Sequence, residues 1–284
     1  MEPDALDRLA IEFICAFGMP PVDFVRMATS LDVSRIGMAP APITDNPHGF
    51  PAWDLRQDPA LVRDMKAALG DSGISLAQGE GFLIMPGLEI ADSEPLLDIF
   101  VELGAPMVNA VSLEQDRPRA IGQFAKLAEM AEARGMNATL EFMPLMWPAT
   151  IVEADAFVIE SSAANGKLML DAMHLYRSGG SEADLAAIDP AHIGYAQLCD
   201  VPMPEGCAPP PPEQMGSYGE EARQERRRPG DGDLPLDRFL AAVPRDVTIG
   251  LETPIFSKAK AGVAPIDAIR PCVEAALSLL AALD

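Results

Sequence analysis

The sequence predicts an α/β protein that folds as a single (β/α)8 TIM barrel with one long loop after the seventh strand. Short apolar runs alternate with amphipathic helical segments, which is the pattern of a parallel sheet covered by helices. There are eight such runs, and a chain of 284 residues, 49% hydrophobic and 23% charged, is long enough for one large core. We therefore expect one domain over residues 1–284.

The predicted strands are separated by helical segments of ordinary length. The strands cover residues 9–17, 34–40, 74–80, 106–113, 137–143, 167–174, 193–200 and 247–253. Apolar residues at three- and four-residue spacing predict helices such as 59–73, 117–135 and 153–166, each ending near a glycine.

Composition limits the compartment and the partners. No run approaches about 18 apolar residues, and the start "MEPDALDRLAIEF" lacks the basic and then apolar pattern of a secretory signal, so we expect a cytoplasmic protein without membrane attachment. The four cysteines show no zinc-binding or disulfide spacing. The 43 acidic and 21 basic residues give a net charge of -22, which repels nucleic acid. A small-molecule substrate is the partner that fits, and a homo-oligomer stays open.

One interval breaks the alternation. Residues 201–235, "VPMPEGCAPPPPEQMGSYGEEARQERRRPGDGDLP", are rich in proline and charge and far exceed a usual strand-to-helix connection. Barrel active sites are built from the loops that follow the strands, so we expect a loop at the active site, with a short helix at "EEARQERRR". A floppy surface loop is the alternative.

Four consecutive strands end in side chains that carry oxygen. They supply Glu141 from the fifth strand, Asp171 from the sixth, Gln197 from the seventh and Glu252 from the eighth. These positions converge at one end of a barrel, where three carboxylates stay ionised together only if a cation compensates them. We therefore predict one divalent metal ion with these four ligands. An all-oxygen shell suits Mg2+ or Mn2+. His174, just past the end of the sixth strand, is placed to donate a hydrogen bond to a substrate oxygen.

The motifs "TLEFMP", "LMLDAMHLYRSGG", "IGYAQLCD", "RRRPGDGDLPL" and "IGLETP" resemble those of the xylose isomerase-like TIM barrel superfamily, specifically the sugar phosphate isomerase/epimerase family. The resemblance spans nearly the whole chain. It implies a Mn2+ or Mg2+ site on the same four ligands, contact of His174 with substrate, and an arginine before Pro-Gly, here Arg228, that reaches in from the loop. The seventh-strand ligand of the family is often histidine, whereas Gln197 is similar to the hydroxypyruvate isomerase branch and some 3-dehydroshikimate dehydratases.

The predicted site indicates a reaction that begins with proton removal next to a carbonyl. A metal ion that binds the carbonyl and its neighbouring hydroxyl stabilises the enediolate that forms. We expect Glu141 and Glu252 to be the acid/base pair, because they flank the metal from non-adjacent strands. Return of the proton to the opposite face gives an epimer, and return to the neighbouring carbon gives an isomer. Loss of a β-hydroxyl instead is dehydration.

The sequence thus favours a metal-dependent isomerase or epimerase of a small hydroxy-carbonyl compound. The alternatives are a dehydratase of the 3-dehydroshikimate type and a non-catalytic barrel that binds a metal or ligand. A DNA-repair endonuclease of the same superfamily is disfavoured by the three histidines and the negative charge. His48 and Trp53, in the loop "TDNPHGFPAWDL" after the second strand, are expected to line the substrate pocket, although such residues as often only pack the loop down.

Overall fold

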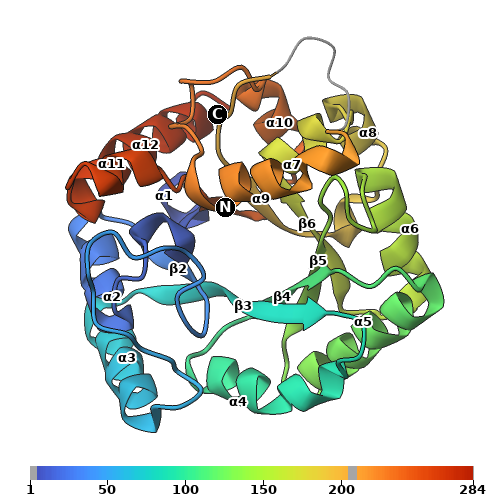
Figure 1. Ribbon diagram of the computed structural model, residues 1–284, viewed down its shortest axis with the longest axis horizontal. Coiled ribbons are helices and arrows are strands. Elements are labelled where there is room, and N and C mark those ends of the chain that lie inside the picture. Colours follow the sequence, from blue (N-terminus) through green and yellow to red (C-terminus); the bar gives the residue numbers. More distant parts are fainter. Residues whose placement is uncertain (1–4, 204–209, 284) are drawn as a thin grey trace.

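The chain folds into a closed eight-stranded parallel barrel, as the alternation of strands and helices predicts. In this computed structural model, which describes residues 5–203 and 210–283, the strands follow one another in chain order around the barrel and β8 pairs with β1. The strands are β1 (Leu9–Ile11), β2 (Arg35–Met38), β3 (Ser75–Ile84), β4 (Met107–Ser112), β5 (Asn137–Glu141), β6 (Gly166–Asp171), β7 (Ile193–Leu198) and β8 (Thr248–Leu251). Helices surround the barrel in Figure 1.

The three predicted amphipathic segments are helices, although α6 begins at Ile151 and ends at Ser161 instead of at residue 166. The helices are α1 (Ala5–Arg8), α2 (Pro21–Ser30), α3 (Pro59–Ser72), α4 (Glu94–Glu102), α5 (Arg117–Glu132), α6 (Ile151–Ser161), α7 (Ala172–Arg177), α8 (Glu182–Ala186), α9 (Met215–Gln224), α10 (Leu236–Ala242), α11 (Phe256–Lys260) and α12 (Pro265–Ala281). Asp58 and Asp116 cap the first turns of α3 and α5 by accepting backbone N–H groups. None of the described helices is long and apolar enough to cross a membrane.

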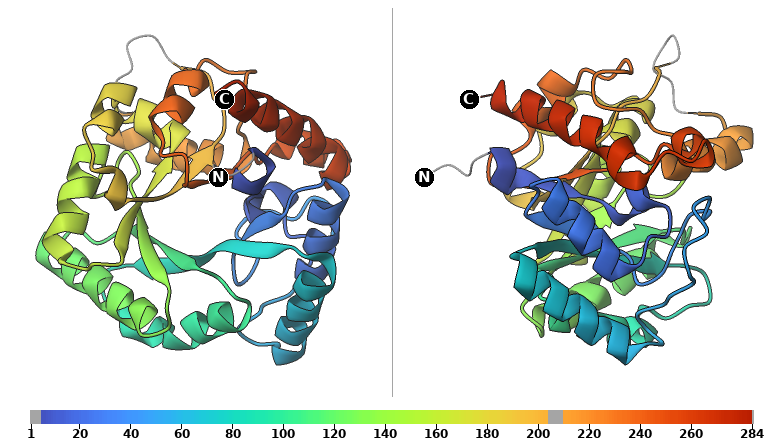
Figure 2. Two further views of the ribbon diagram at one scale, coloured as in Figure 1. Left: turned by 180° about the vertical axis from the view of Figure 1, so that it is seen from behind. Right: turned by 90° about the vertical axis from the view of Figure 1, so that its left-hand side faces the viewer.

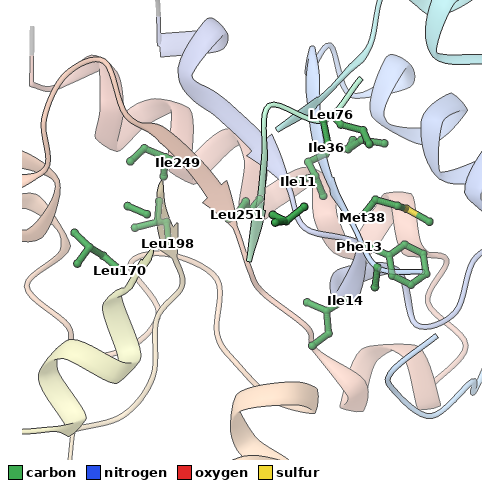
Figure 3. Close-up of a cluster of buried hydrophobic side chains, with 14 of the residues drawn as sticks. Ile11, Phe13, Ile14, Ile36, Met38, Leu76, Leu170, Leu198, Ile249 and Leu251 are labelled. Carbon is green, nitrogen blue, oxygen red and sulfur yellow. The ribbon is translucent and has the colours of Figure 1, made fainter. Parts of the chain in front are cut away.

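Side chains alternate between the two faces of each strand, and this alternation fixes what enters the barrel. Leu168 and Leu170 of β6 belong to the large apolar cluster between strands and helices, whereas Met169 packs with Ala10, Ala77 and Tyr195 in a small cluster of its own. Figure 3 shows outward-facing members of the large cluster, contributed by several strands. Asp171 and Gln197 come two residues after Met169 and Tyr195 on the same strands, so their side chains also point into the barrel.

Three predicted strands differ most from the observed ones. The third is longer than predicted and runs to Ile84 instead of Glu80. The first is shorter than predicted, because Phe13–Ala16 forms a buried 3-10 helix. The sixth ends at Asp171, whose side chain accepts the backbone N–H of His174 and so begins helix α7. His174 therefore lies on the first turn of a helix and not on a strand.

Asp200, which follows β7, anchors the end of the long loop. Its buried carboxylate accepts backbone N–H groups of Gly230, Gly232 and Leu234, and its backbone pairs with Arg227. This contact folds the "PGDGDL" segment back onto the barrel. Helix α9 of the same loop lies at the end of the barrel opposite α1, as the side view of Figure 2 shows. Residues 204–209 of the predicted loop lie outside the described residues.

Candidate active site at the barrel mouth

One pocket opens at the carboxyl ends of the strands and contains several of the predicted site residues. It has a volume of about 570 Å³, and Glu141, His174 and Glu252 line it. Helix α9 contributes Met215 and Tyr218 to the same lining. The structure thus places the described part of the long loop across the barrel mouth.

Glu141 and His174 face each other on the β5–β6 side of this mouth. Glu141 Oε1 lies 3.4 Å from His174 Nε2, and Glu141 Oε2 accepts a hydrogen bond of 3.0 Å from Asn109. The other ring nitrogen of His174 lies 2.6 Å from the hydroxyl of Tyr218 on α9. Burial raises the pKa of Tyr218, so this hydroxyl keeps its proton and can donate it to His174 Nδ1. Nε2 then carries the ring hydrogen and points toward Glu141.

Arg226, just after α9, binds two of the four predicted metal ligands. Its buried guanidinium donates to Asp171 Oδ2, and its other terminal nitrogen lies 2.8 Å from Glu252 Oε2. Burial raises the pKa of Asp171 most strongly, but the charge of Arg226, the field of His174 and the hydrogen bonds from both residues together outweigh it, and the pKa falls to about 2. Burial holds the pKa of Glu252 well above its usual range, with Arg226 opposing the shift.

Gln197 is turned toward a second acidic group that lies deeper in the barrel. Glu12 follows β1 and accepts hydrogen bonds from Tyr195, at 2.7 Å, and from Gln78, at 3.3 Å, while Gln197 and Glu80 also contact it. Burial raises the pKa of Glu12 to about 7.

Two glycines make room for Glu12. A Cβ atom at Gly37 of β2 or Gly250 of β8 would lie 1.7 or 1.9 Å from its carboxylate oxygens. Neither position therefore accepts any other residue while Glu12 keeps this place.

The donors at the mouth fit a divalent cation, although the best-placed set differs from the predicted one. Glu141, Asp171 and His174 each offer one ligand atom, and these atoms lie within 4.8 Å of one another. Among the described residues no other such group occurs, so Glu252 is not part of it. Gln197 Oε1 is buried and accepts no hydrogen bond from the described part of the chain, which leaves it available as a ligand.

The buried charges at the barrel mouth also favour a bound cation. Glu12, Glu80, Glu141, Asp171 and Glu252 gather around a single buried guanidinium, that of Arg226. Burial raises the pKa of Glu12, Glu80 and Glu252, and repulsion between the carboxylates adds to the rise at Glu80 and Glu252. One guanidinium does not compensate all five groups, so a bound cation would favour their ionised forms. Arg226 and a metal ion would draw on the same oxygens of Asp171 and Glu252, and we therefore expect them to compete.

The remaining predicted residues do not reach the pocket. Arg228 is 40% exposed in its side chain and pairs with Asp231 at 2.7 Å, so the arginine that enters from the loop is Arg226, two residues earlier. Arg226 is held on the pocket side by its backbone N–H, which donates to the carbonyl of Pro254, and by its Nε–H, which donates to the carbonyl of Ala222. Trp53 donates its ring N–H to the carbonyl of Gly18 and packs edge-on against Phe13, so it holds its loop down. His48 stacks near Phe50 and is likewise absent from the lining of this pocket.

Sequence reasoning missed three charged residues of the site. Glu12 could have been found from the sequence, because it is the one charged residue in an apolar run. It lies two residues after Ala10, whose side chain points into the barrel, so Glu12 points the same way. Glu80 lies in "AQGEGF", where the flanking glycines obscure the alternation of the strand. Nothing in three successive arginines distinguishes Arg226 from its neighbours, because the residues that hold it, Asp171 and Glu252, are distant in the sequence.

Comparisons with known proteins agree with the architecture. The family model described as xylose isomerase-like TIM barrel matches residues 33–271. No curated protein matches the chain.

Solved structures with the same fold cover nearly the whole chain. They include the IOLI protein with a bound zinc atom (TM-score 0.78, 16% identity, 98% of this chain and 99% of that one) and D-psicose 3-epimerase with D-tagatose from Clostridium cellulolyticum H10 (0.65, 15%, 97% and 98%). A third is the probable 3-DHS dehydratase AsbF from Bacillus anthracis (0.71, 12%, 92% and 97%). At these identities the structural likeness shows the fold alone. The match of the family model over most of the sequence, on a closed barrel with acidic residues at its mouth, shows that the chain belongs to the xylose isomerase-like TIM barrel family.

Proposed function

We propose that this protein is a divalent-metal-dependent isomerase or epimerase that removes a proton next to the carbonyl of a small hydroxy-carbonyl substrate. The observation that carries the proposal is the meeting of Glu141, His174 and Glu252 in one pocket at the carboxyl end of the barrel. Sugar epimerases and a dehydratase among the solved structures of the same fold support an enzyme of this class.

Glu141 is the proposed base. Asn109 binds one of its oxygens and leaves the other facing His174 and the pocket. The bond from Asn109 orients the carboxylate without neutralising it, which keeps it able to accept a proton. His174, held by Tyr218, donates from Nε2 to a substrate oxygen next to the reacting carbon.

Glu252 is the proposed acid that returns the proton. Burial raises its pKa, so its protonated form is favoured, and it enters the pocket from β8, across the mouth from Glu141. Two carboxyl groups with different surroundings can thus serve opposite roles. A Mn2+ or Mg2+ ion, held by Glu141 and Asp171 with Gln197 or Glu252, would stabilise negative charge that develops on the substrate oxygens.

The test is solvent deuterium exchange. The protein, loaded with Mn2+, is incubated in heavy water with a panel of hydroxy-ketones and 2-keto acids, and deuterium at the carbon next to the carbonyl is measured by NMR. We expect exchange from at least one compound, and its loss after chelation. Exchange that persists at full rate in protein shown to be free of metal would refute the metal requirement.

A further inference from the structure

The roof of the pocket is a helix face with unusually small residues. Gly216, Gly219 and Ala222 of α9 line the pocket together with Met215 and Tyr218. A glycine inside a helix costs about 1 kcal/mol relative to alanine, and this ten-residue helix holds two of them on its pocket face. A Cβ atom at Gly216 would meet no atom within 4 Å. The glycines therefore keep open a space that side chains would otherwise fill.

The rim of the pocket is apolar and exposed. Ile43, Leu83 and Met215 are 48%, 46% and 44% exposed, and they are three of the eight exposed large hydrophobic side chains among the described residues. They come from three separate segments and all line this pocket. Exposed apolar side chains that converge on one opening mark a place where an apolar ligand group binds.

The inner wall continues the apolar character. Phe82, Val111, Leu113, Met143 and Met146 line the pocket between the rim and the acidic floor. A free sugar carries hydroxyl groups on nearly every carbon, and burying these against side chains that cannot hydrogen-bond is unfavourable. Polar partners are concentrated at the floor, so the pocket accommodates one reactive polar unit and an apolar remainder.

One cation at the pocket is free to bind an anion. Arg223 lines the pocket from α9, and across residues 5–203 and 210–283 its guanidinium has neither an ion pair nor a hydrogen bond. Its neighbours Arg177, Arg226 and Arg228 are all ion-paired. A Cβ atom at Gly219 would lie 3.2 Å from Arg223 Nη1, so the missing side chain lets Arg223 lie back along the roof.

We propose that the site takes an amphipathic acid: a molecule whose hydroxy-carbonyl unit is joined to an apolar group and whose carboxylate reaches Arg223. This rests on the proposed function for the reactive unit, and it replaces a free sugar as the substrate class. The apolar group packs against the rim and inner wall, the glycine face of α9 covers it, and Arg223 selects the anion.

The test measures binding of three probes by isothermal titration calorimetry. The first, 4-phenylbutyrate, carries an apolar ring and a carboxylate. The second is its amide, which has the same ring and no charge. The third, D-fructose, is a polar sugar. We expect the acid to bind about tenfold more tightly than the amide, as one charge-assisted contact provides, and D-fructose to bind most weakly. In Arg223→Gln the preference for the acid should disappear, whereas Arg228→Gln, a change at an exposed paired arginine, should preserve it.

A second pair of variants tests the apolar part. Gly216→Leu fills the open space under the roof and should abolish binding of both phenyl probes. Leu83→Asn, at an exposed rim position that tolerates a polar residue, should weaken both phenyl probes equally and leave their ratio unchanged. D-fructose binding at least as tightly as 4-phenylbutyrate, or an unchanged acid-to-amide ratio in Arg223→Gln, would overturn the proposal.

Binding is measured by heat and needs no turnover. Probe selectivity without any deuterium exchange would therefore remove the proposed reaction and keep the ligand class. Deuterium exchange confined to sugars, with no preference among the three probes, would keep the proposed reaction and remove the proposed ligand class.

Discussion

The two sides of the barrel mouth compensate their buried carboxylates in different ways. On the β5–β6 side, Glu141 contacts Asn109 and the ring of His174, and no lysine or arginine of the described chain pairs with it. On the β7–β8 side, Glu252 is paired with the guanidinium of Arg226, which also reaches across to Asp171. The β7–β8 side therefore holds a fixed cation, the guanidinium of Arg226, and within the described residues the β5–β6 side has no such cation next to Glu141. A metal ion is therefore expected to bind first where Arg226 leaves oxygens free, next to Glu141.

The largest expected effect is at the base. Glu141→Gln keeps the shape and the bond to Asn109 but cannot accept a proton, so deuterium exchange should fall by about 100-fold or more. Glu252→Gln is the matched variant across the mouth, and it should still exchange deuterium while forming little product. Metal content is measured alongside by mass spectrometry. Equal loss of exchange in both variants, with metal retained, would end the distinction between the two glutamates.

Removal of the fixed cation comes next. Arg226→Met leaves buried Asp171 uncompensated and should lower the free energy of unfolding of metal-free protein by about 3–5 kcal/mol. Added Mn2+ should restore more stability to this variant than to the wild type, because the ion no longer competes with a guanidinium. Urea unfolding measures both, and Arg228→Met, at an exposed ion pair, is the control, with a change below about 1 kcal/mol. Weaker Mn2+ binding by Arg226→Met would contradict the competition.

The deeper acid predicts a pH dependence. The pKa of Glu12 is raised from 4.5 to about 7, so the native state holds a proton that the unfolded chain has lost between these values. Its contribution to stability is complete below the unfolded pKa and disappears as pH rises through 7, a loss of about 3 kcal/mol for metal-free protein. Unfolding midpoints at pH 5 and pH 8 measure it. Glu12→Gln should flatten this slope, and an unchanged slope would remove Glu12 as its source.

The smallest effect is expected outside the pocket. Trp53→Phe removes the ring N–H that binds the carbonyl of Gly18 and should cost about 1 kcal/mol of stability with no change in deuterium exchange. Thermal unfolding and the exchange assay provide the comparison. A large loss of deuterium exchange with unchanged stability would show that Trp53 acts in substrate binding and not only in packing its loop.

Most of the fold and one side of the site could be predicted from the sequence. Strand periodicity and the eight-fold alternation follow from local patterns, and strand-end positions are forced together by a closed barrel, which is why Glu141 and Asp171 were identified correctly as neighbours. The β7–β8 side depends on contacts distant in sequence, among them the pairing of Asp200 with Arg227. Arg226 is held inward by further distant partners, Pro254, Asp171 and Glu252, and no local pattern encodes them. The packing of Trp53 on Phe13 is equally long-range.

The most direct test of the account is crystallographic. Crystals soaked in MnCl2 and measured at the manganese absorption edge should show one anomalous peak about 2 Å from oxygens of Glu141 and Asp171, with Arg226 withdrawn from at least one of its two carboxylates. The absence of any peak beside Glu141 at saturating Mn2+, with Arg226 still bridging Asp171 and Glu252, would contradict it.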